Sequence, residues 1–210
     1  MSARDDVLMR IRSALADKPA QRPVPRDYRL TGETDPTALR ELLIDRLRDY
    51  KASVRLAPRA SIEVVVAAAL ADRGLRTLAV PVGLDERWLA DAAAVDLRRD
   101  SLARPLAAAA LDGVDGVLTA SALAIAETGT IVLDGSAGQG RRVLTLVPDY
   151  HLCVVVPENV VATVPEGLRR LDASRAQTWI SGPSATSDIE LQRVEGVHGP
   201  RTLEVIVVVD

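Results

Sequence analysis

The last residues of the chain, "LEVIVVVD" (203–210), have the pattern of a strand buried on both faces, because every residue from 203 to 209 except Glu204 is apolar. The runs "HLCVVVP" (151–157) and "RTLAVPVG" (76–83) have the same character, rich in the β-branched valine that favours strands. Helical patterns such as "SIEVVVAAALADRG" (61–74) alternate with these strands. The alternation predicts an α/β fold with a mainly parallel central sheet and helices on both faces.

Between these runs the pattern changes. Helices are predicted at "DERWLADAAA" (85–94) and "DSLARPLAAAALDG" (100–113), although Pro105 weakens the second one. After Val114 strand patterns follow one another without helices between them, which predicts some hairpin pairing. These strands are "GVLTA" (116–120), "GTIVLD" (129–134), "RVLTLVP" (142–148) and "HLCVVVP" (151–157); the helix "VPEGLRRLDAS" (164–174) and the strand "TWISG" (178–182) follow them.

The beginning of the chain has a separate organisation. Ser2 can cap a first helix with Asp5 at its third position, and the stripe of Leu8, Ile11 and Leu15 is narrow. Three prolines then make residues 17–35 an extended arm. We therefore predict a helix and proline-rich arm over residues 1–34. A single domain over 35–210 then begins where Asp35 caps a helix with Pro36.

Composition excludes several classes of protein. The 210 residues carry a net charge of only −3, which gives no electrostatic reason to expect binding to nucleic acid or to a membrane surface. No apolar run approaches the ~20 residues of a membrane span, and the charged N-terminal residues do not form a secretory signal. The single cysteine, Cys153, excludes an internal disulfide and a thiolate cluster. We expect a cytoplasmic protein that binds no metal or cofactor of its own.

The first candidate cluster is Glu127-Thr128-Gly129-Thr130, a polar break in the apolar run "ALAIAETGTIVL" (122–133). In one interpretation Gly129 turns a hairpin and Glu127 is merely solvated. In the other, Glu127 is a carboxylate at a strand end, where α/β sheets collect ligands, and acts as nucleophile or general base. The residues alone leave both interpretations open.

The second cluster, "DGSAGQGRR" (134–142), combines three glycines with Arg141 and Arg142. Backbone N–H groups and two guanidinium groups could bind an anion there. The stretch lacks the lysine and hydroxyl ending of a phosphate-binding P-loop and does not open a helix. A flexible connection between strands is the alternative.

The third cluster lies in "PDYHLCVVVPENVV" (148–161). In a strand, Asp149, His151 and Cys153 would share one face, a set that could ligate a metal. A structural or substrate-facing histidine and cysteine are favoured instead, with His151 as acid, base or hydrogen-bond donor.

The fourth cluster is "SGPSATSDIELQRVEGVHGPR" (181–201). The spacing from Ser187 to Glu190 fits a capping box, which predicts a helix that begins there. The free N–H groups of such a helix and nearby hydroxyl groups would suit an anion, and a capped helix without a binding role is the alternative. The candidate ligand-binding residues are Ser184, Thr186, Asp188, Glu190 and, between two glycines, His198.

Three of these motifs occur in an order that resembles one known family. "ALAIAETGTIVL", "PDYHLCVVVPENVV" and "SGPSATSDIELQRVEGVHGPRTLEVIVV" together are similar to the lactate utilization protein C family, the LUD-domain proteins. The resemblance extends from about Asp35 to the end of the chain, and the N-terminal helix and arm also resemble that family's start.

The resemblance implies a fold of the NagB/RpiA/CoA-transferase-like superfamily with a site at strand ends. It also implies a role in bacterial oxidation of L-lactate to pyruvate, beside two iron–sulfur partner proteins that carry the clusters. Related CoA transferases use a glutamate as nucleophile, and Glu127 is the candidate for that position. Fold alone does not assign a role, so the ligand and the chemistry stay open.

Three functions therefore compete. The first is the cluster-free subunit of a lactate-oxidising system, which binds a small anion between Glu127, the two arginines and the segment from Ser184 to Glu190. The second is a stand-alone transferase or ligase-like enzyme for a CoA-linked or phosphorylated acid, with Glu127 as nucleophile or base. The third is an assembly module that uses the N-terminal helix as a tether. A homo-oligomer is compatible with all three.

Overall fold

The computed structural model describes residues 2–17, 23–32, 34–187, 193–195 and 199–209. Within these ranges six strands form a central sheet in the order β1-β12-β7-β4-β2-β3, and every neighbouring pair is parallel. The strands are β1 (Ser53–Pro58), β2 (Thr77–Pro81), β3 (Asp96–Asp100), β4 (Gly116–Ala120), β7 (Tyr150–Val155) and β12 (Thr202–Val209). The predicted mainly parallel sheet is confirmed, and the C-terminal strand lies inside it rather than at an edge.

The second sheet, which the sequence did not predict as a separate layer, packs on one face of the central sheet. Its order among the described strands is β8-β5-β6-β9, with an antiparallel hairpin between β5 and β6. These strands are β5 (Leu123–Ile125), β6 (Thr130–Leu133), β8 (Val160–Val161) and β9 (Thr178–Ile180). A separate pair joins β10 (Ala185–Ser187) to β11 (Arg193–Glu195).

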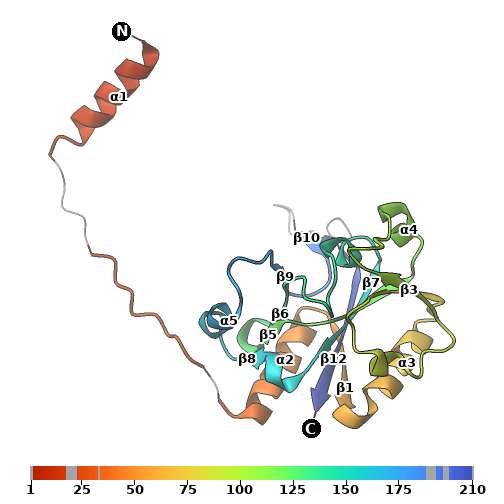
Figure 1. Ribbon diagram of the computed structural model, residues 1–210. Coiled ribbons are helices and arrows are strands. Elements are labelled where there is room, and N and C mark those ends of the chain that lie inside the picture. Colours follow the sequence, from red (N-terminus) through yellow and green to blue (C-terminus); the bar gives the residue numbers. More distant parts are fainter. Residues whose placement is uncertain (1, 18–22, 33, 188–192, 196–198, 210) are drawn as a thin grey trace.

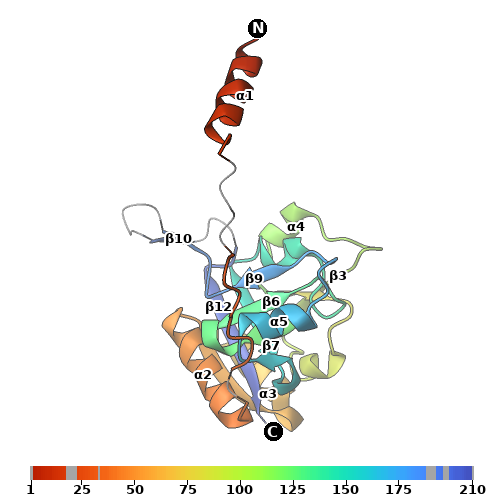
Figure 2. The same cartoon turned by 90° about the vertical axis from the view of Figure 1, so that its left-hand side faces the viewer.

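Helices cover both faces of the central sheet, as predicted (Figures 1 and 2). Helix α3 (Ile62–Asp72) packs through Val66 on the face that carries Ile206 and Val208. On the opposite face, Leu43 and Leu47 of α2 (Pro36–Asp49) join the side chains of β12 and of the second sheet in one apolar core. The remaining body helices are α4 (Ala108–Asp112) and α5 (Val164–Arg170).

The loop and helix predictions for the middle of the chain need correction. The predicted helix over 100–113 is only α4, because Asp100 ends β3 and Pro105 disfavours helical backbone before it. The predicted helix over 85–94 is a 3₁₀ turn, Glu86–Leu89, which leads within a few residues to β3.

The predicted strand over 142–148 is wrong as well. Its first part is a 3₁₀ turn, η4 (Arg142–Thr145), in which Leu144 packs against Ala79 and Leu111. Ser187, the predicted cap of a helix, lies in β10, where its backbone pairs with Arg193; residues 188–192, in which that helix would begin, lie outside the described residues.

The N-terminal helix α1 (Ala3–Ala14) has the predicted Ser2–Asp5 capping box, and it contains no buried residue. Figure 1 shows it apart from the body, beyond the extended arm. The arm is held on the body near Leu30, whose carbonyl accepts from Arg169, and Gly32, whose N–H donates to Glu166 (3.0 Å). None of the helices described is long and apolar enough to cross a membrane.

Candidate functional site

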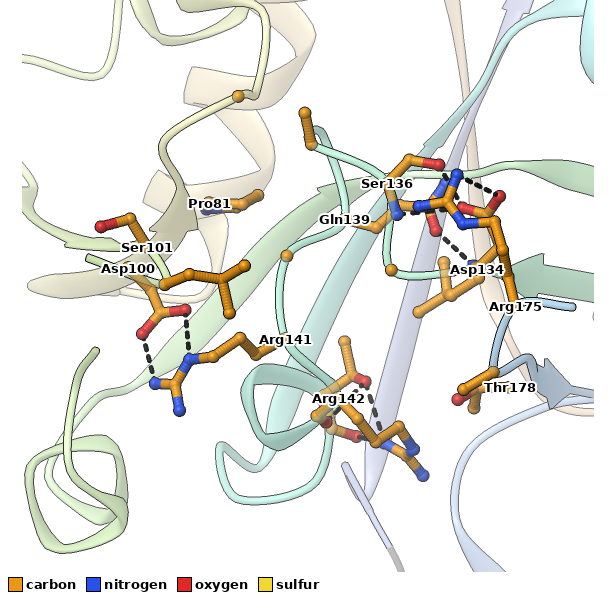
Figure 3. Close-up of a pocket in the computed structure, with 18 of the residues that line it drawn as sticks. Pro81, Asp100, Ser101, Asp134, Ser136, Gln139, Arg141, Arg142, Arg175 and Thr178 are labelled. Atoms are coloured by element: carbon orange, nitrogen blue, oxygen red, sulfur yellow. Dashed lines mark hydrogen bonds and ion pairs between the residues drawn. The ribbon is translucent and has the colours of Figure 1, made fainter. Parts of the chain in front are cut away.

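Two adjoining cavities lie beside the glycine-rich loop. The larger one, about 680 Å³, lies between the carboxyl ends of β2 and β3, the loop 134–142 and the segment 175–178 (Figure 3). The smaller one, about 240 Å³, lies between the beginnings of β7 and β12 and the segment 178–184. Arg142, Thr145 and Thr178 line both cavities, so the two spaces share a wall.

The neighbours Arg141 and Arg142 differ in their pairing. Arg141 holds the fully buried carboxylate of Asp100 with two hydrogen bonds and also donates to the carbonyl of Leu106 (2.8 Å). Burial raises the pKa of Asp100, but Arg141 and the N–H of Leu106 outweigh this and hold that pKa below its usual value. Arg141 is therefore part of the wall as a neutralised pair, as Figure 3 shows.

Arg142, in contrast, has no carboxylate within salt-bridge distance among the described residues. Its guanidinium donates to the carbonyl and the hydroxyl of Thr145, both at 2.9 Å. Burial lowers its pKa, but an arginine stays charged at neutral pH. Arg142 thus presents an uncompensated positive charge to both cavities.

His151 lines the smaller cavity and is 1 % exposed. Its Nε2 lies 2.8 Å from the hydroxyl oxygen of Thr119. Burial, together with the positive charge of Arg142, lowers the pKa of His151 to about 3. The ring is therefore neutral at pH 7, with one nitrogen as donor and the other as acceptor.

Cys153 shares the face of His151, as predicted, whereas Asp149 precedes β7 and forms an exposed ion pair with Arg201 (3.4 Å). Cys153 is buried beside Thr119, and burial raises the pKa of its thiol to about 12. The metal-ligand set considered for Asp149, His151 and Cys153 does not form, because Asp149 lies outside the strand and faces solvent.

The motif around Glu127 forms a hairpin corner. The 3₁₀ turn η3 (Ala126–Thr128) joins β5 to β6, and Gly129 adopts a left-handed conformation with φ of 58°. A Cβ at Gly129 would lie 2.8 Å from the backbone of Arg46, so α2 approaches too closely for another residue. The hairpin interpretation is confirmed for the backbone.

Glu127 itself is bound by the N-terminal arm. Both of its carboxylate oxygens meet the guanidinium of Arg29, each at 2.6 Å. Glu127 is absent from the lining of either cavity described above. Its predicted catalytic role stays a prediction, and the structure does not bring it together with Arg142 or His151.

The threonines beside Glu127 reach the smaller cavity indirectly. The hydroxyl oxygens of Thr128 and Thr130 are 2.7 Å apart, and that of Thr130 is 2.8 Å from the hydroxyl oxygen of Ser181. Ser181 lines the smaller cavity together with Ser184. Of the predicted residues, the structure therefore brings Arg142, His151 and Ser184 to one space, with Thr130 behind Ser181.

Other predicted ligand-binding residues have different positions. Thr186 belongs to β10, where its backbone pairs with Val194. Asp188, Glu190 and His198 lie outside the described residues. Sequence reasoning missed Thr119, Thr145 and Ser181; the signal for Thr119 was a hydroxyl residue inside an otherwise apolar strand.

Comparisons with known proteins agree on one family. The LUD domain model matches residues 40–208. A protein named lactate utilization protein C from Deinococcus radiodurans is 50 % identical over 168 residues, which cover 78 % of this chain and 76 % of that protein. The protein of the same name from Shouchella clausii is 36 % identical over 100 residues, or 44 % of this chain and 43 % of that one.

A solved structure is also similar. The crystal structure of a DUF162 family protein from Deinococcus radiodurans aligns with a TM-score of 0.72 and 40 % sequence identity, covering 84 % of this chain and 100 % of that one. The resemblance seen in the sequence motifs is confirmed. This chain belongs to the LUD domain family.

Proposed function

We propose that this protein takes part in lactate utilization, as the cluster-free component of a cytoplasmic system that oxidises L-lactate to pyruvate with two iron–sulfur partner proteins. The support is its similarity to proteins named lactate utilization protein C, which for the Deinococcus radiodurans protein extends over 78 % of the chain. In this proposal the clusters that carry electrons belong to the partners, and this chain binds a small organic acid.

The smaller cavity is the proposed binding place for that acid, and the observation that carries the proposal is the charge of Arg142, which pairs with no carboxylate of the residues that the structure describes. A guanidinium group presents paired donors that match a carboxylate. Among the described residues, no carboxylate forms a salt bridge with this guanidinium group. A ligand carboxylate would therefore be its first acidic partner. A small 2-hydroxy or 2-oxo acid fits this requirement.

His151 would orient the second polar group of the acid. Thr119 engages Nε2, and the described residues offer no hydrogen bond to Nδ1. With a pKa of about 3, the ring is a weak base near pH 7. We therefore assign His151 the role of a neutral hydrogen-bond partner for a hydroxyl or carbonyl oxygen, rather than that of a general base.

Calorimetric titration of the full chain with L-lactate, D-lactate and pyruvate tests the site. Arg142→Ala should weaken binding about 10- to 100-fold, the effect of losing charged hydrogen bonds. Arg98→Ala is the matched control, because Arg98 is exposed and pairs with Asp96 at the protein surface. Equal affinities of Arg142→Ala and the wild type would exclude this site.

Reconstitution tests the function. L-lactate oxidation with an artificial electron acceptor is measured for the two partner proteins with and without this chain. Activity that needs all three supports the proposed subunit. Equal rates without this chain, or unimpaired growth on lactate after deletion of its gene, would contradict it.

A further inference from the structure

The larger cavity has walls whose acidic groups are already neutralised. Asp100 is held by Arg141, and Asp134 accepts from the N–H of Ser136 (3.0 Å) and pairs with Arg175 (3.3 Å). Figure 3 shows these pairs on two sides of the space and Arg142 between them. Among the described residues that line this cavity, Arg142 is the cation without an acidic partner. The cavity therefore offers a ligand one full positive charge.

The mouth of this cavity exposes apolar side chains. Leu102 is 87 % exposed and Val82 is 54 % exposed, and both line the cavity. Pro81, Leu133, Ala137 and Ala176 add further apolar lining. Exposed apolar surface around a cavity costs free energy in water and is typical of binding sites. An uncharged, apolar body is the chemistry that would cover it.

The glycine-rich loop forms its wall without help from a ligand. The carbonyl of Gly138 accepts from the N–H of Ala120 (2.9 Å), and the carbonyl of Ser136 accepts from the N–H groups of Gln139 and Gly140. A Cβ on Gly83 would lie only 2.4 Å from that of Ala137, so the segment that follows β2 is in close contact with the loop. The wall is thus preformed, and a cavity of about 680 Å³ falls within the usual size of organic ligand sites.

From this geometry we propose that the larger cavity binds a second ligand, an elongated organic anion. Its single anionic group lies at Arg142, and its apolar body extends past Ala137 to Leu102 and Val82. One unpaired cation matches one anionic group rather than a polyphosphate. Because Arg142 lines both cavities and carries one charge, this ligand and the small acid of the proposed function would compete for it. The inference goes beyond the proposed function and does not depend on the identity of the acid.

The probe for the test is 8-anilinonaphthalene-1-sulfonate, an aromatic sulfonate whose fluorescence rises in apolar surroundings. Titration of the full, folded chain should show saturable binding at one site. Leu102→Glu should weaken binding about fivefold or more, because it replaces the apolar contact with the aromatic rings of the probe by a charged group. Arg142→Gln should weaken it about 10-fold or more.

Leu168→Glu is the matched control, because Leu168 is 56 % exposed on α5 and is absent from the lining of this cavity. If Leu102→Glu and Leu168→Glu bind the probe equally, or if binding does not saturate, the proposal is overturned. Ala176→Trp, which fills the cavity from an exposed position, is the second variant if Leu102→Glu folds poorly. Probe binding that is unchanged in Ala176→Trp would also overturn the proposal.

The same variants separate this inference from the proposed function. Leu102→Glu should leave L-lactate binding unchanged, since Leu102 lines the larger cavity and not the smaller one. Loss of probe binding with retained lactate binding supports two ligands. If Leu102→Glu leaves probe binding intact, the proposed ligand of the larger cavity is contradicted, whereas the proposed binding of the small acid in the smaller cavity is unaffected.

Discussion

Tyr150 and His151 are consecutive residues of β7 and point to opposite faces of the central sheet, into two very different polar clusters. On the face of α3, the buried carboxylate of Glu204 accepts hydrogen bonds from Arg55, from Arg73 (3.2 Å) and from the hydroxyl of Tyr150 (3.1 Å). The guanidinium of Arg73 also lies over the Tyr150 ring. On the face of the second sheet, His151 and Cys153 have Thr119 as their polar neighbour.

The two clusters differ in the charged partners that surround their buried groups. Glu204 forms ion pairs with two arginines, while burial and this carboxylate raise the pKa of Tyr150. The second cluster contains no opposite charge, so burial drives His151 and Cys153 to their neutral forms. The paired charges serve stability, whereas the neutral cluster adjoins a cavity in which Arg142 forms a salt bridge with none of the described carboxylates. Substitutions in each cluster should therefore have different signatures.

The largest effect should come from the charged cluster. Glu204→Ala leaves Arg55 and Arg73 turned toward a buried space without their carboxylate. We expect the free energy of unfolding to fall by about 3 kcal/mol, the lower end for breaking a buried pair, because both arginines keep some access to water. Urea unfolding should show a lower midpoint with an unchanged slope.

Asp96→Ala is the control for this loss, since Asp96 belongs to an exposed pair with Arg98. Such a pair contributes about 0–1 kcal/mol. If Glu204→Ala is no less stable than Asp96→Ala, the charged cluster does not stabilise the fold.

The next effect is a pH dependence that comes from the neutral cluster. The pKa of His151 is 6.5 in the unfolded chain and about 3 in the folded one, so the unfolded chain binds a proton first as the pH falls. This contribution to stability is present above pH 6.5 and is lost as the pH falls toward 3. By pH 4.5 it should cost about 2–3 kcal/mol.

Comparison with His151→Gln isolates this term, because the carboxyl groups titrate in both proteins and cancel. Unfolding free energies measured from pH 7 to 4.5 should fall more steeply for the wild type than for the variant. Parallel curves would show that His151 is protonated as easily in the folded chain as in water.

The sequence predicted the sheet better than it predicted the site, for a physical reason. Runs such as 151–157 and 203–209 are mostly apolar on both faces and rich in valine, which favours a covered parallel strand. The run 142–148, which begins with Arg142 and is interrupted by Thr145, misled, because an apolar run indicates burial rather than conformation. Leu144 is fully buried, yet it lies in a 3₁₀ turn with no partner strand among the described residues.

For the site, the missing information was long-range pairing. Arg141 and Arg142 look identical in sequence, and only the fold shows that Asp100, forty-one positions away, neutralises the first of them. Likewise Arg29 is ninety-eight positions from Glu127. Local patterns could identify the polar clusters, but which charges find a partner depends on the tertiary structure.

A smaller effect tests the support of His151 by Thr119. Thr119→Val keeps the shape of the side chain and removes the hydroxyl group, which should lower the free energy of unfolding by about 1 kcal/mol. Thr119→Ser, which keeps the hydroxyl group, should be closer to the wild type in the nitrogen-15 NMR shifts of the His151 ring. If both variants leave those shifts unchanged, Thr119 does not fix the ring.

The smallest effect concerns the arm. The Arg29–Glu127 pair is at the surface, with the Arg29 side chain 64 % exposed, and exposed pairs contribute little to stability. Arg29→Ala should therefore leave the melting temperature of the body within experimental error. It should nevertheless speed limited proteolysis within residues 23–28, because the contacts at Leu30 and Gly32 then hold the arm without the ion pair.

Arg26→Ala, a neighbouring arm substitution away from Glu127, is the control. Equal cleavage rates for the two variants would show that the ion pair does not anchor the arm, and a lowered melting temperature for Arg29→Ala would show that the arm is part of the cooperative fold.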